Sequence, residues 1–106
     1  MSADCIFCKI ISGVIPAKKI YEDDDVIVFN DIKPMAKTHF MIVPKLHVET
    51  LKDCDTTHQV LLGKILLLAP KLAAEQGLMG FKTLINTGRE GGQEVFHLHL
   101  HIFGDG

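Results

Sequence analysis

Three histidines near the end of the chain offer its clearest chemistry: His97, His99 and His101 alternate with apolar residues in the run His-Leu-His-Leu-His-Ile-Phe at 97–103. Successive side chains of a β-strand point to opposite faces, so a strand here would place all three imidazoles on one face. A simple solvated strand face is the alternative, but such a face usually carries Thr, Lys or Glu. We therefore expect one face to perform chemistry and the other to pack.

The spacing of the three imidazoles divides their roles. On an extended strand, neighbouring rings of one face lie about 6.7 Å apart and the outer two about 13 Å apart. This separation is too large for one metal ion to bind all three at about 2 Å. A neutral imidazole attacks phosphorus well, and the P–N bond it forms is labile, so histidine can accept and release a nucleotidyl group. The central His99 is the candidate nucleophile, and His101 is the candidate for stabilising the phosphate charge.

Two further features can join this face. His39 lies in a second segment of period-two pattern, and it reaches the triplet if that strand is adjacent; otherwise it is an exposed strand histidine. The segment Gly-Arg-Glu-Gly-Gly-Gln at 88–93 leads directly into the triplet. Glycine lets backbone N–H groups approach anionic oxygens, so we expect the amides around Gly92 and the side chain of Gln93 to hold a phosphate beside His99. A flexible connection between strands is the alternative.

The pair Cys5 and Cys8 indicates a metal site. Tetrahedral zinc needs four ligands, and two thiolates with two neutral imidazoles would give a neutral site. His47 and His97, the outer member of the triplet, are the candidate imidazoles, so we expect a structural zinc held by these four residues. A redox pair and two buried cysteines acting as small hydrophobic residues are the alternatives.

The elements that position these residues predict an α+β fold with a sheet of about five antiparallel strands, one long helix and a short N-terminal helix. Thr56 and Gln59 fit a capping box at the start of the long helix, Gly77 ends it, and Pro70 should distort it. Apolar residues cover most of the circumference of this helix, so we expect a second copy of the chain to pack against it in a homodimer. The expected strands are 19–22, 26–29, 38–43, 81–86 and 97–103.

Composition bounds the class of protein. The 106 residues carry a formal net charge of −2 without a basic run, and we expect a single domain, 1–106, that binds no nucleic acid. No apolar stretch reaches the roughly 18 residues of a membrane span, and Met1 to Cys5 lack the pattern of a signal peptide. We therefore expect a soluble cytoplasmic protein without a membrane partner.

Taken together, these residues resemble the histidine triad (HIT) superfamily, and nearly the whole chain resembles its bacterial HINT-like branch. The run from His97 to Phe103 matches the triad signature. Supporting matches lie at Cys5-Ile-Phe-Cys-Lys-Ile-Ile, Phe29-Asn-Asp-Ile32, Thr38-His-Phe-Met-Ile-Val-Pro-Lys45 and Asn86 to Phe96. The resemblance implies the HIT-like fold, with the sheets of two subunits joined across a homodimer and a purine-nucleotide site on each subunit.

The resemblance also implies an activity: hydrolysis of purine nucleoside 5′-monophosphoramidates or related adenylates through a nucleotidylated histidine. A dinucleoside polyphosphate hydrolase and a nucleotide-binding scaffold dimer with little turnover are the alternatives. By the family pattern His99 is the nucleophile, His101 and His39 support it, and Asn86 and Gln93 position the phosphate. Asp31 accepts hydrogen bonds from the ribose, the base pocket is formed by Phe7, Phe29 and Ile32, and Cys5, Cys8, His47 and His97 match the zinc ligands of some bacterial members.

Overall fold

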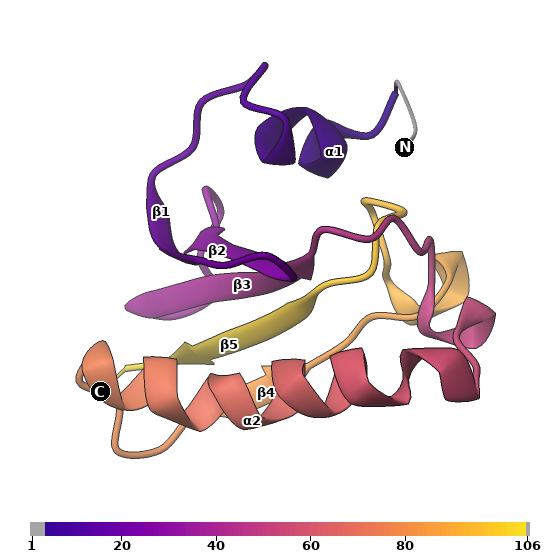
Figure 1. The fold of residues 1–106 in the computed structure, drawn as a ribbon. Helices are drawn as coiled ribbons and strands as arrows, with labels where there is room; N and C mark the ends of the chain where they lie inside the picture. Colours follow the sequence, from indigo (N-terminus) through magenta and orange to yellow (C-terminus); the bar gives the residue numbers. More distant parts are fainter. Residues whose placement is uncertain (1–3, 106) are drawn as a thin grey trace.

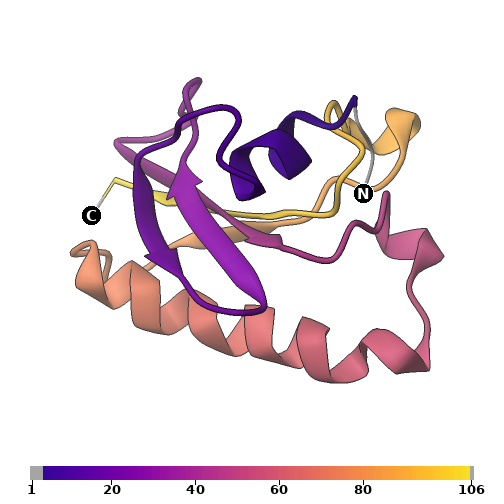
Figure 2. The same cartoon turned by 45° about the horizontal axis from the view of Figure 1, so that its top comes forward.

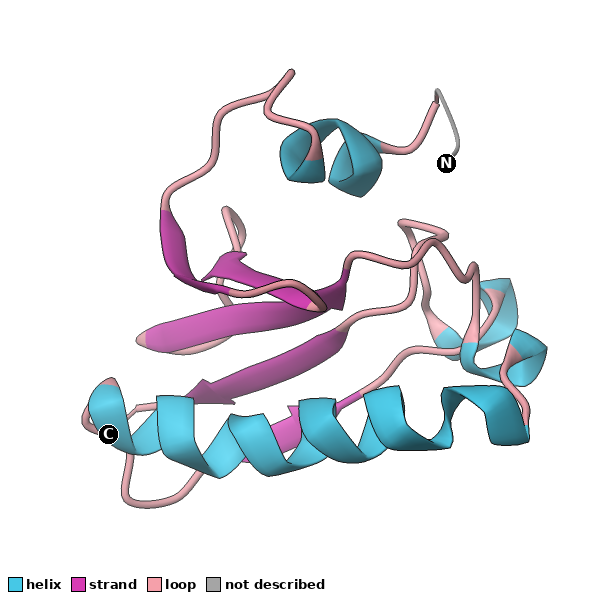
Figure 3. Ribbon diagram, viewed as in Figure 1, coloured by secondary structure: helices cyan, strands magenta, loops and turns pink. Residues whose placement is uncertain are grey.

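The computed structural model describes residues 4–105, which form five strands and two α-helices (Figures 1 and 3). In chain order the elements are α1 (Ile6–Ile11), β1 (Lys19–Glu22), β2 (Val26–Asn30), β3 (Thr38–Pro44), α2 (Gln59–Glu75), β4 (Lys82–Leu84) and β5 (Leu100–Gly104). Short 3₁₀ turns occupy Leu51–Asp53, Thr56–His58 and Arg89–Gly91. None of the helices in the described part of the chain is long and apolar enough to cross a membrane.

The strands form one antiparallel sheet in the order β1-β2-β3-β5-β4. The sheet lies between the two helices, with α1 over one face and α2 along the other (Figures 1 and 2). Strands β3 and β5 are neighbours, with Met41 opposite His101 and His39 opposite Phe103. The predicted α+β fold of five antiparallel strands is confirmed, and the His39 strand is adjacent to the histidine segment, which is the condition for His39 to join the triplet.

The face toward α2 is an apolar core. Alternate residues of the three central strands meet the buried stripe of the helix, as period-two and helical patterns require. Its buried members are Val26, Val28, Phe40, Ile42, Ile65, Leu68, Ala69, Leu72, Ala73, Leu78, Leu100 and Ile102. This layer holds the central strands rigidly, and the residues that alternate with it therefore face α1 from a fixed scaffold.

The face toward α1 combines an apolar cluster with the histidines. Phe7 of α1 packs edge-on against Phe29 of β2, with ring centroids 5.5 Å apart. The other buried members of this cluster are Cys5, Cys8, Ile27, Met41 and Val43. His39, His99 and His101 are buried as well, at 3%, 8% and 8% exposure. The face toward α2 is thus entirely apolar in its buried core, and the buried histidines His39, His99 and His101 lie on the face toward α1.

The histidine strand is shorter than predicted, because β5 begins at Leu100 rather than at position 97. Pro44, at the end of β3, has no amide hydrogen with which to extend the ladder. Its carbonyl instead accepts a hydrogen bond from Nε2 of His97, at 2.7 Å. The alternation of faces survives without the ladder, since Leu100 joins the α2 core while His99 faces α1. β4 is also shorter than the predicted 81–86.

The start of the long helix differs from the prediction as well. A 3₁₀ turn at Thr56–His58 precedes α2, and Asp55 rather than Thr56 caps this turn. The Asp55 side chain accepts a hydrogen bond from Thr57 N–H, and the Asp55 N–H donates to His58 Nδ1. The predicted box of Thr56 with Gln59 is therefore wrong, because Asp55 offers a carboxylate one position earlier. Pro70 lies inside α2 without ending it, on the exposed side.

Gly77 follows the helix as predicted. Its φ of +85° is the left-handed conformation that favours glycine, and Leu78 N–H bonds back to the carbonyl of Ala73.

Candidate active site and metal centre

A cavity of about 720 Å³ opens between α1, the β2–β3 connection and the histidine segment. This size suits a mononucleotide-sized ligand, since small-molecule sites usually measure about 300–1,000 Å³. Most of the residues predicted to act on or bind a nucleotide line it, namely the catalytic candidates His39, His99 and His101 and the binding candidates Phe7, Phe29, Asp31, Ile32, Asn86 and Gly92. Residues from four separate segments of the chain thus meet at one concave surface.

His99 presents a free lone pair to this cavity. Its Nδ1 lies 2.7 Å from the carbonyl oxygen of His97, and a carbonyl can only accept, so Nδ1–H donates. In the neutral ring the lone pair then belongs to Nε2. Burial lowers the pKa of His99, against the opposing effects of the His97 carbonyl and Asp31, which favours the neutral form that a nucleophile needs.

His101 and His39 form a second pair beside the nucleophile. The ring of His101 lies 4.8 Å from that of His99, centroid to centroid, and its Nδ1 lies 2.9 Å from His39 Nε2. An Asp31 carboxylate oxygen lies 3.5 Å from His39 Nε2 and 3.7 Å from His101 Nδ1. The other carboxylate oxygen of Asp31 accepts a hydrogen bond from the N–H of Lys33 at 2.8 Å, which fixes the orientation of the carboxylate.

Both rings of this pair are neutral at physiological pH. Burial, followed by the neighbouring His99 and His39, lowers the pKa of His101 from 6.5 to about 4, although Asp31 opposes the change. Burial likewise lowers the pKa of His39. Neutral imidazoles act as hydrogen-bond donors and acceptors of defined direction, so the placement of their protons decides what each ring can do.

The glycine-rich segment approaches the cavity through Gly92, whose φ of +87° is left-handed. A Cβ at this position would lie 3.7 Å from Asn86 Oδ1, so the segment and Asn86 are in contact at the rim. Gln93 is placed differently from the prediction, because its side chain does not line the cavity. Its Nε2 donates to the carbonyls of Glu49 and Val95 and its Oε1 accepts from Gly88 N–H. Gln93 therefore braces the glycine-rich segment rather than holding a phosphate with its side chain.

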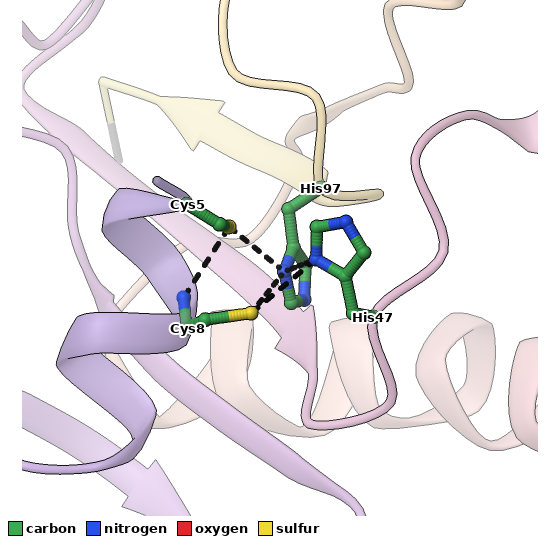
Figure 4. Close-up of side chains that lie close together, drawn as sticks. All are labelled: Cys5, Cys8, His47 and His97. Carbon is green, nitrogen blue, oxygen red and sulfur yellow. Dashed lines mark hydrogen bonds between the residues drawn. The ribbon is translucent and has the colours of Figure 1, made fainter. Parts of the chain in front are cut away.

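The four predicted metal ligands lie together at one end of the sheet, with their ligand atoms all within 4.8 Å of one another (Figure 4). Cys5 caps α1 and Cys8 follows one turn later. His97 precedes β5, and His47 follows β3. Residues 92 positions apart in the chain, Cys5 and His97, meet here at 3.3 Å between Sγ and Nδ1.

The spacing of these atoms fits a tetrahedral zinc ion. At usual bond lengths the edges of such a site measure about 3.3 Å between two nitrogens and about 3.6 Å between nitrogen and sulfur. The two Nδ1 atoms are 3.1 Å apart, Cys8 Sγ lies 3.3 Å from His47 Nδ1, and Cys8 Sγ lies 3.6 Å from His97 Nδ1. His97 Nε2 donates to the carbonyl of Pro44, which leaves the lone pair of Nδ1 directed at the sulfurs, as for a metal-bound histidine.

Phe7 connects this cluster to the nucleophile. It lies between Cys5 and Cys8 in sequence, and its ring contacts His97 at 5.8 Å and His99 at 5.0 Å, edge-on in both cases. It also lines the cavity. Whatever holds the two cysteines in place therefore also holds one wall of the candidate nucleotide site.

Comparison with known proteins agrees with this geometry. A family model described as "Scavenger mRNA decapping enzyme C-term binding" matches residues 4–105, and Protein HitA of Neisseria gonorrhoeae is 53% identical over 102 residues, covering 95% of each chain. The chain belongs to the HIT superfamily. The purine nucleoside phosphoramidase of Escherichia coli (strain K12) is 41% identical over 106 residues, covering 98% of this HIT chain and 89% of its own.

Solved structures extend the likeness to the whole fold. A HIT family hydrolase from Legionella pneumophila Philadelphia 1 superposes with a TM-score of 0.93 at 46% identity, covering 95% of this chain and 92% of its own. A histidine triad protein from Clostridium difficile gives a TM-score of 0.94 at 44% identity, covering 100% and 95%. The HIT-like fold predicted from the triad is thereby confirmed.

Sequence reasoning missed several residues that line the cavity, and Met35 is the one that contacts a site histidine through its backbone. The backbone N–H of Met35 donates to Nδ1 of His39 at 3.0 Å, and Met35 also lines the cavity. A backbone donor leaves no mark in residue types, so no pattern pointed to it. Met41, in contrast, shares a face with His39 by the period-two rule and was identifiable from that spacing.

Proposed function

We propose that this HIT protein hydrolyses purine nucleoside 5′-monophosphoramidates or closely related adenylates. The observation that carries the proposal is the orientation of His99, whose Nε2 lone pair faces a nucleotide-sized cavity while Nδ1–H is held by the His97 carbonyl. The coarser statement, that the chain is a HIT-family nucleotide hydrolase, follows from its family and from the printed name of its Escherichia coli relative. The substrate class is the finer step that we add.

The reaction proceeds in two displacements at phosphorus. His99 Nε2 attacks the α-phosphorus, a P–N bond forms to the ring, and the P–N bond to the leaving amine breaks with its electron pair going to the amine, which takes a proton from solvent. Water then attacks the same phosphorus, the P–Nε2 bond breaks with its electron pair returning to the ring, and the water proton leaves to solvent. The His101 ring stabilises charge on the phosphate oxygens.

The rest of the cavity suits a nucleoside. Phe7, Phe29 and Ile32 form an apolar wall for the base, and the Asp31 carboxylate accepts hydrogen bonds from ribose hydroxyls. Asn86 lies at the rim with Gly92 and positions the phosphate. These roles combine the lining of the cavity with the family pattern.

Turnover of adenosine 5′-phosphoramidate tests the proposal directly. Wild-type protein should release AMP, and intact-mass spectrometry of quenched reactions should detect an adenylyl adduct that peptide mapping assigns to His99. His99→Ala should lose turnover by at least about 10³-fold and form no adduct, because the attacking lone pair is removed. Equal slow turnover by both proteins would refute the enzymatic role and favour a nucleotide-binding scaffold.

A dinucleoside polyphosphate hydrolase is the second candidate function, since the same nucleophile serves it with a phosphate leaving group. Diadenosine polyphosphate in the same assay separates the two. Faster turnover of this substrate than of the phosphoramidate would favour the second candidate.

We further propose that Cys5, Cys8, His47 and His97 hold a structural zinc ion. Two thiolates and two imidazoles neutralise Zn²⁺, and the ion would join α1 to the segment before β5, thereby holding the Phe7 wall. Reduced thiolates of this kind fit a cytoplasmic location. Elemental analysis of protein purified without chelator should give about one zinc per chain. A metal-free protein of unchanged thermal stability would oppose the proposal and leave the redox and buried-cysteine alternatives.

A homodimer is the proposed assembly. Val60 and Leu67 of α2 are 87% and 77% exposed, and they lie about two helical turns apart on the side away from the sheet. Strand β4 is an edge strand. A second copy packing on this side would cover the helix and allow the two sheets to continue through β4. Light scattering should report twice the chain mass for wild type and the monomer for Leu67→Lys. A wild-type monomer at micromolar concentration would contradict this assembly.

A further inference from the structure

We propose that His39 is a positioning residue that fixes the tautomer of His101, so that His101 presents an N–H donor to the phosphate while neighbouring His99 presents a lone pair. The inference deepens the proposed function and rests on it for its catalytic meaning. The geometry that carries it is a hydrogen-bond chain of three groups, which runs from the backbone of Met35 through His39 to His101.

The first link determines the protonation of His39. A backbone N–H can only donate, so Nδ1 of His39 must accept from Met35, at 3.0 Å. A neutral imidazole with a lone pair on Nδ1 carries its proton on Nε2. His39 is 3% exposed, and its burial favours the neutral ring. His39 is therefore the Nε2–H tautomer.

The second link transmits this choice to His101. His39 Nε2 and His101 Nδ1 lie 2.9 Å apart, and two N–H groups cannot face each other at that distance without strong repulsion. Since His39 Nε2 donates, His101 Nδ1 accepts, and the proton of neutral His101 lies on Nε2. The competing arrangement would send His101 Nδ1–H to the Asp31 carboxylate, but that oxygen lies 3.7 Å away, beyond hydrogen-bond distance.

The outer nitrogen of His101 faces the cavity. Within the described residues no hydrogen bond involves His101 Nε2, and no buried side-chain nitrogen or oxygen there lacks a partner. Nε2 is therefore reachable from the cavity that His101 lines. The result is a pair of rings 4.8 Å apart with opposite functions at the same atom: Nε2 of His99 attacks, and Nε2–H of His101 donates.

The same geometry weakens another interpretation of this cluster. Asp31, His39 and His101 bring three potential ligand atoms together, which is the composition of a metal site. A metal ion would require a lone pair on His39 Nε2, yet the Met35 N–H occupies the only other ring nitrogen as an acceptor. The chain of hydrogen bonds instead uses both ring nitrogens of His39 and Nδ1 of His101 without an ion. No proton is transferred along it during turnover, because His101 acts as a hydrogen-bond donor and stays neutral.

Nuclear magnetic resonance tests the tautomer without reference to activity. In protein labelled with ¹⁵N-histidine at about pH 7, a long-range ¹H–¹⁵N correlation spectrum distinguishes the protonated from the unprotonated ring nitrogen, and His101→Gln identifies the His101 signals. Wild-type His101 should show the proton on Nε2 and the lone pair on Nδ1. A proton on Nδ1 in the wild-type protein would overturn the inference, whatever the variants do.

Two substitutions of His39 that are isosteric with each other, Gln and Glu, test whether His39 sets the tautomer of His101. In His39→Gln the side-chain oxygen can accept from Met35 N–H and the amide can donate to His101, so the His101 tautomer should persist. In His39→Glu the carboxylate can accept from Met35 but cannot donate, so His101 should move its proton to Nδ1. An unchanged His101 tautomer in a folded His39→Glu protein would show that His39 does not set it.

Turnover connects the tautomer to the proposed reaction. Loss of one donor to a developing oxyanion costs about 10²-fold or more in kcat, so His39→Glu should fall by about that factor while His39→Gln stays within about tenfold of wild type. Equal losses in both variants would show that His39 matters for packing and not through its donor. If wild type fails to turn over phosphoramidates but shows the expected tautomer, the proposed substrate is wrong and the role of His39 in directing His101 stands.

Discussion

Acid should destabilise this protein by a defined amount through His101. The ring is 8% exposed, and the folded protein holds its pKa near 4, whereas an unfolded chain leaves it at 6.5. The unfolded state therefore binds the proton more readily between these two values. Stability from this group is present above pH 6.5 and is lost as the pH falls from 6.5 through 4.

The size of the effect follows from the difference between the two pKa values. At 1.36 kcal/mol per pH unit, lowering the pKa from 6.5 to about 4 corresponds to about 3.4 kcal/mol, of which about 2.4 kcal/mol is lost between pH 7 and pH 4.5. Burial of the side chain means that this figure needs little reduction for solvent screening. The lowered pKa of His39 acts in the same direction.

Urea denaturation of wild type and His101→Gln at both pH values isolates the contribution. Glutamine cannot titrate in this range, and its oxygen can still accept from His39 Nε2. The free energy of unfolding of wild type should fall by about 2 kcal/mol more than that of the variant between pH 7 and 4.5. Groups that do not contact His101, including the proposed zinc ligands, cancel in the difference. Parallel pH profiles for the two proteins would refute the reasoning.

Three further substitutions, one of them with a control variant, test other parts of the structure. Phe7→Leu removes the edge-on contacts of this ring with His99 and Phe29, worth about 0.5–1.5 kcal/mol, and should raise KM for the nucleotide about 3- to 10-fold in steady-state kinetics, with zinc content unchanged. Gly92→Ala forces a side chain into the left-handed region and should lower the free energy of unfolding by about 1–2 kcal/mol in urea denaturation. The control Gly63→Ala in α2 has open space at the new Cβ and should not lower it. Leu72→Ala leaves a cavity at a fully buried position between α2 and the sheet and should lower the free energy of unfolding by about 2–5 kcal/mol in the same assay. A loss below about 1 kcal/mol would mean that the core on this face is less well packed than its burial indicates.

Local patterns were sufficient to predict the elements that position the site. Period-two alternation at 38–43 and 97–103 identified the two strands that carry His39 and His101, and the apolar helical pattern ending at Gly77 identified α2. These predictions depend on side-chain direction relative to the local backbone, which short-range geometry determines. The resemblance to the HIT superfamily supplied the remaining pocket residues, because no local pattern joins Phe7 to Asn86.

The errors lie where a distant or competing partner decided the outcome. Asp55 displaced Thr56 as the cap because its carboxylate accepts from Thr57 N–H while its own N–H bonds to His58 Nδ1. Gln93 was predicted to hold phosphate, but the carbonyls of Glu49 and Val95 occupy its amide. The strand of β5 stops short of His97 because Pro44 offers the ladder no donor.

By itself the sequence determined which side chains could share a face, and therefore that three imidazoles, two thiols and a glycine-rich segment would be available for phosphate and metal chemistry. The tertiary structure alone decided what His97 and His101 can do, whereas the partner of His99 is a carbonyl two residues away. His97 is directed by a carbonyl 53 positions away and His101 by a ring 62 positions away. A histidine is donor or acceptor at a given nitrogen only according to the partner at its other nitrogen, and such partners come together only when the chain is folded.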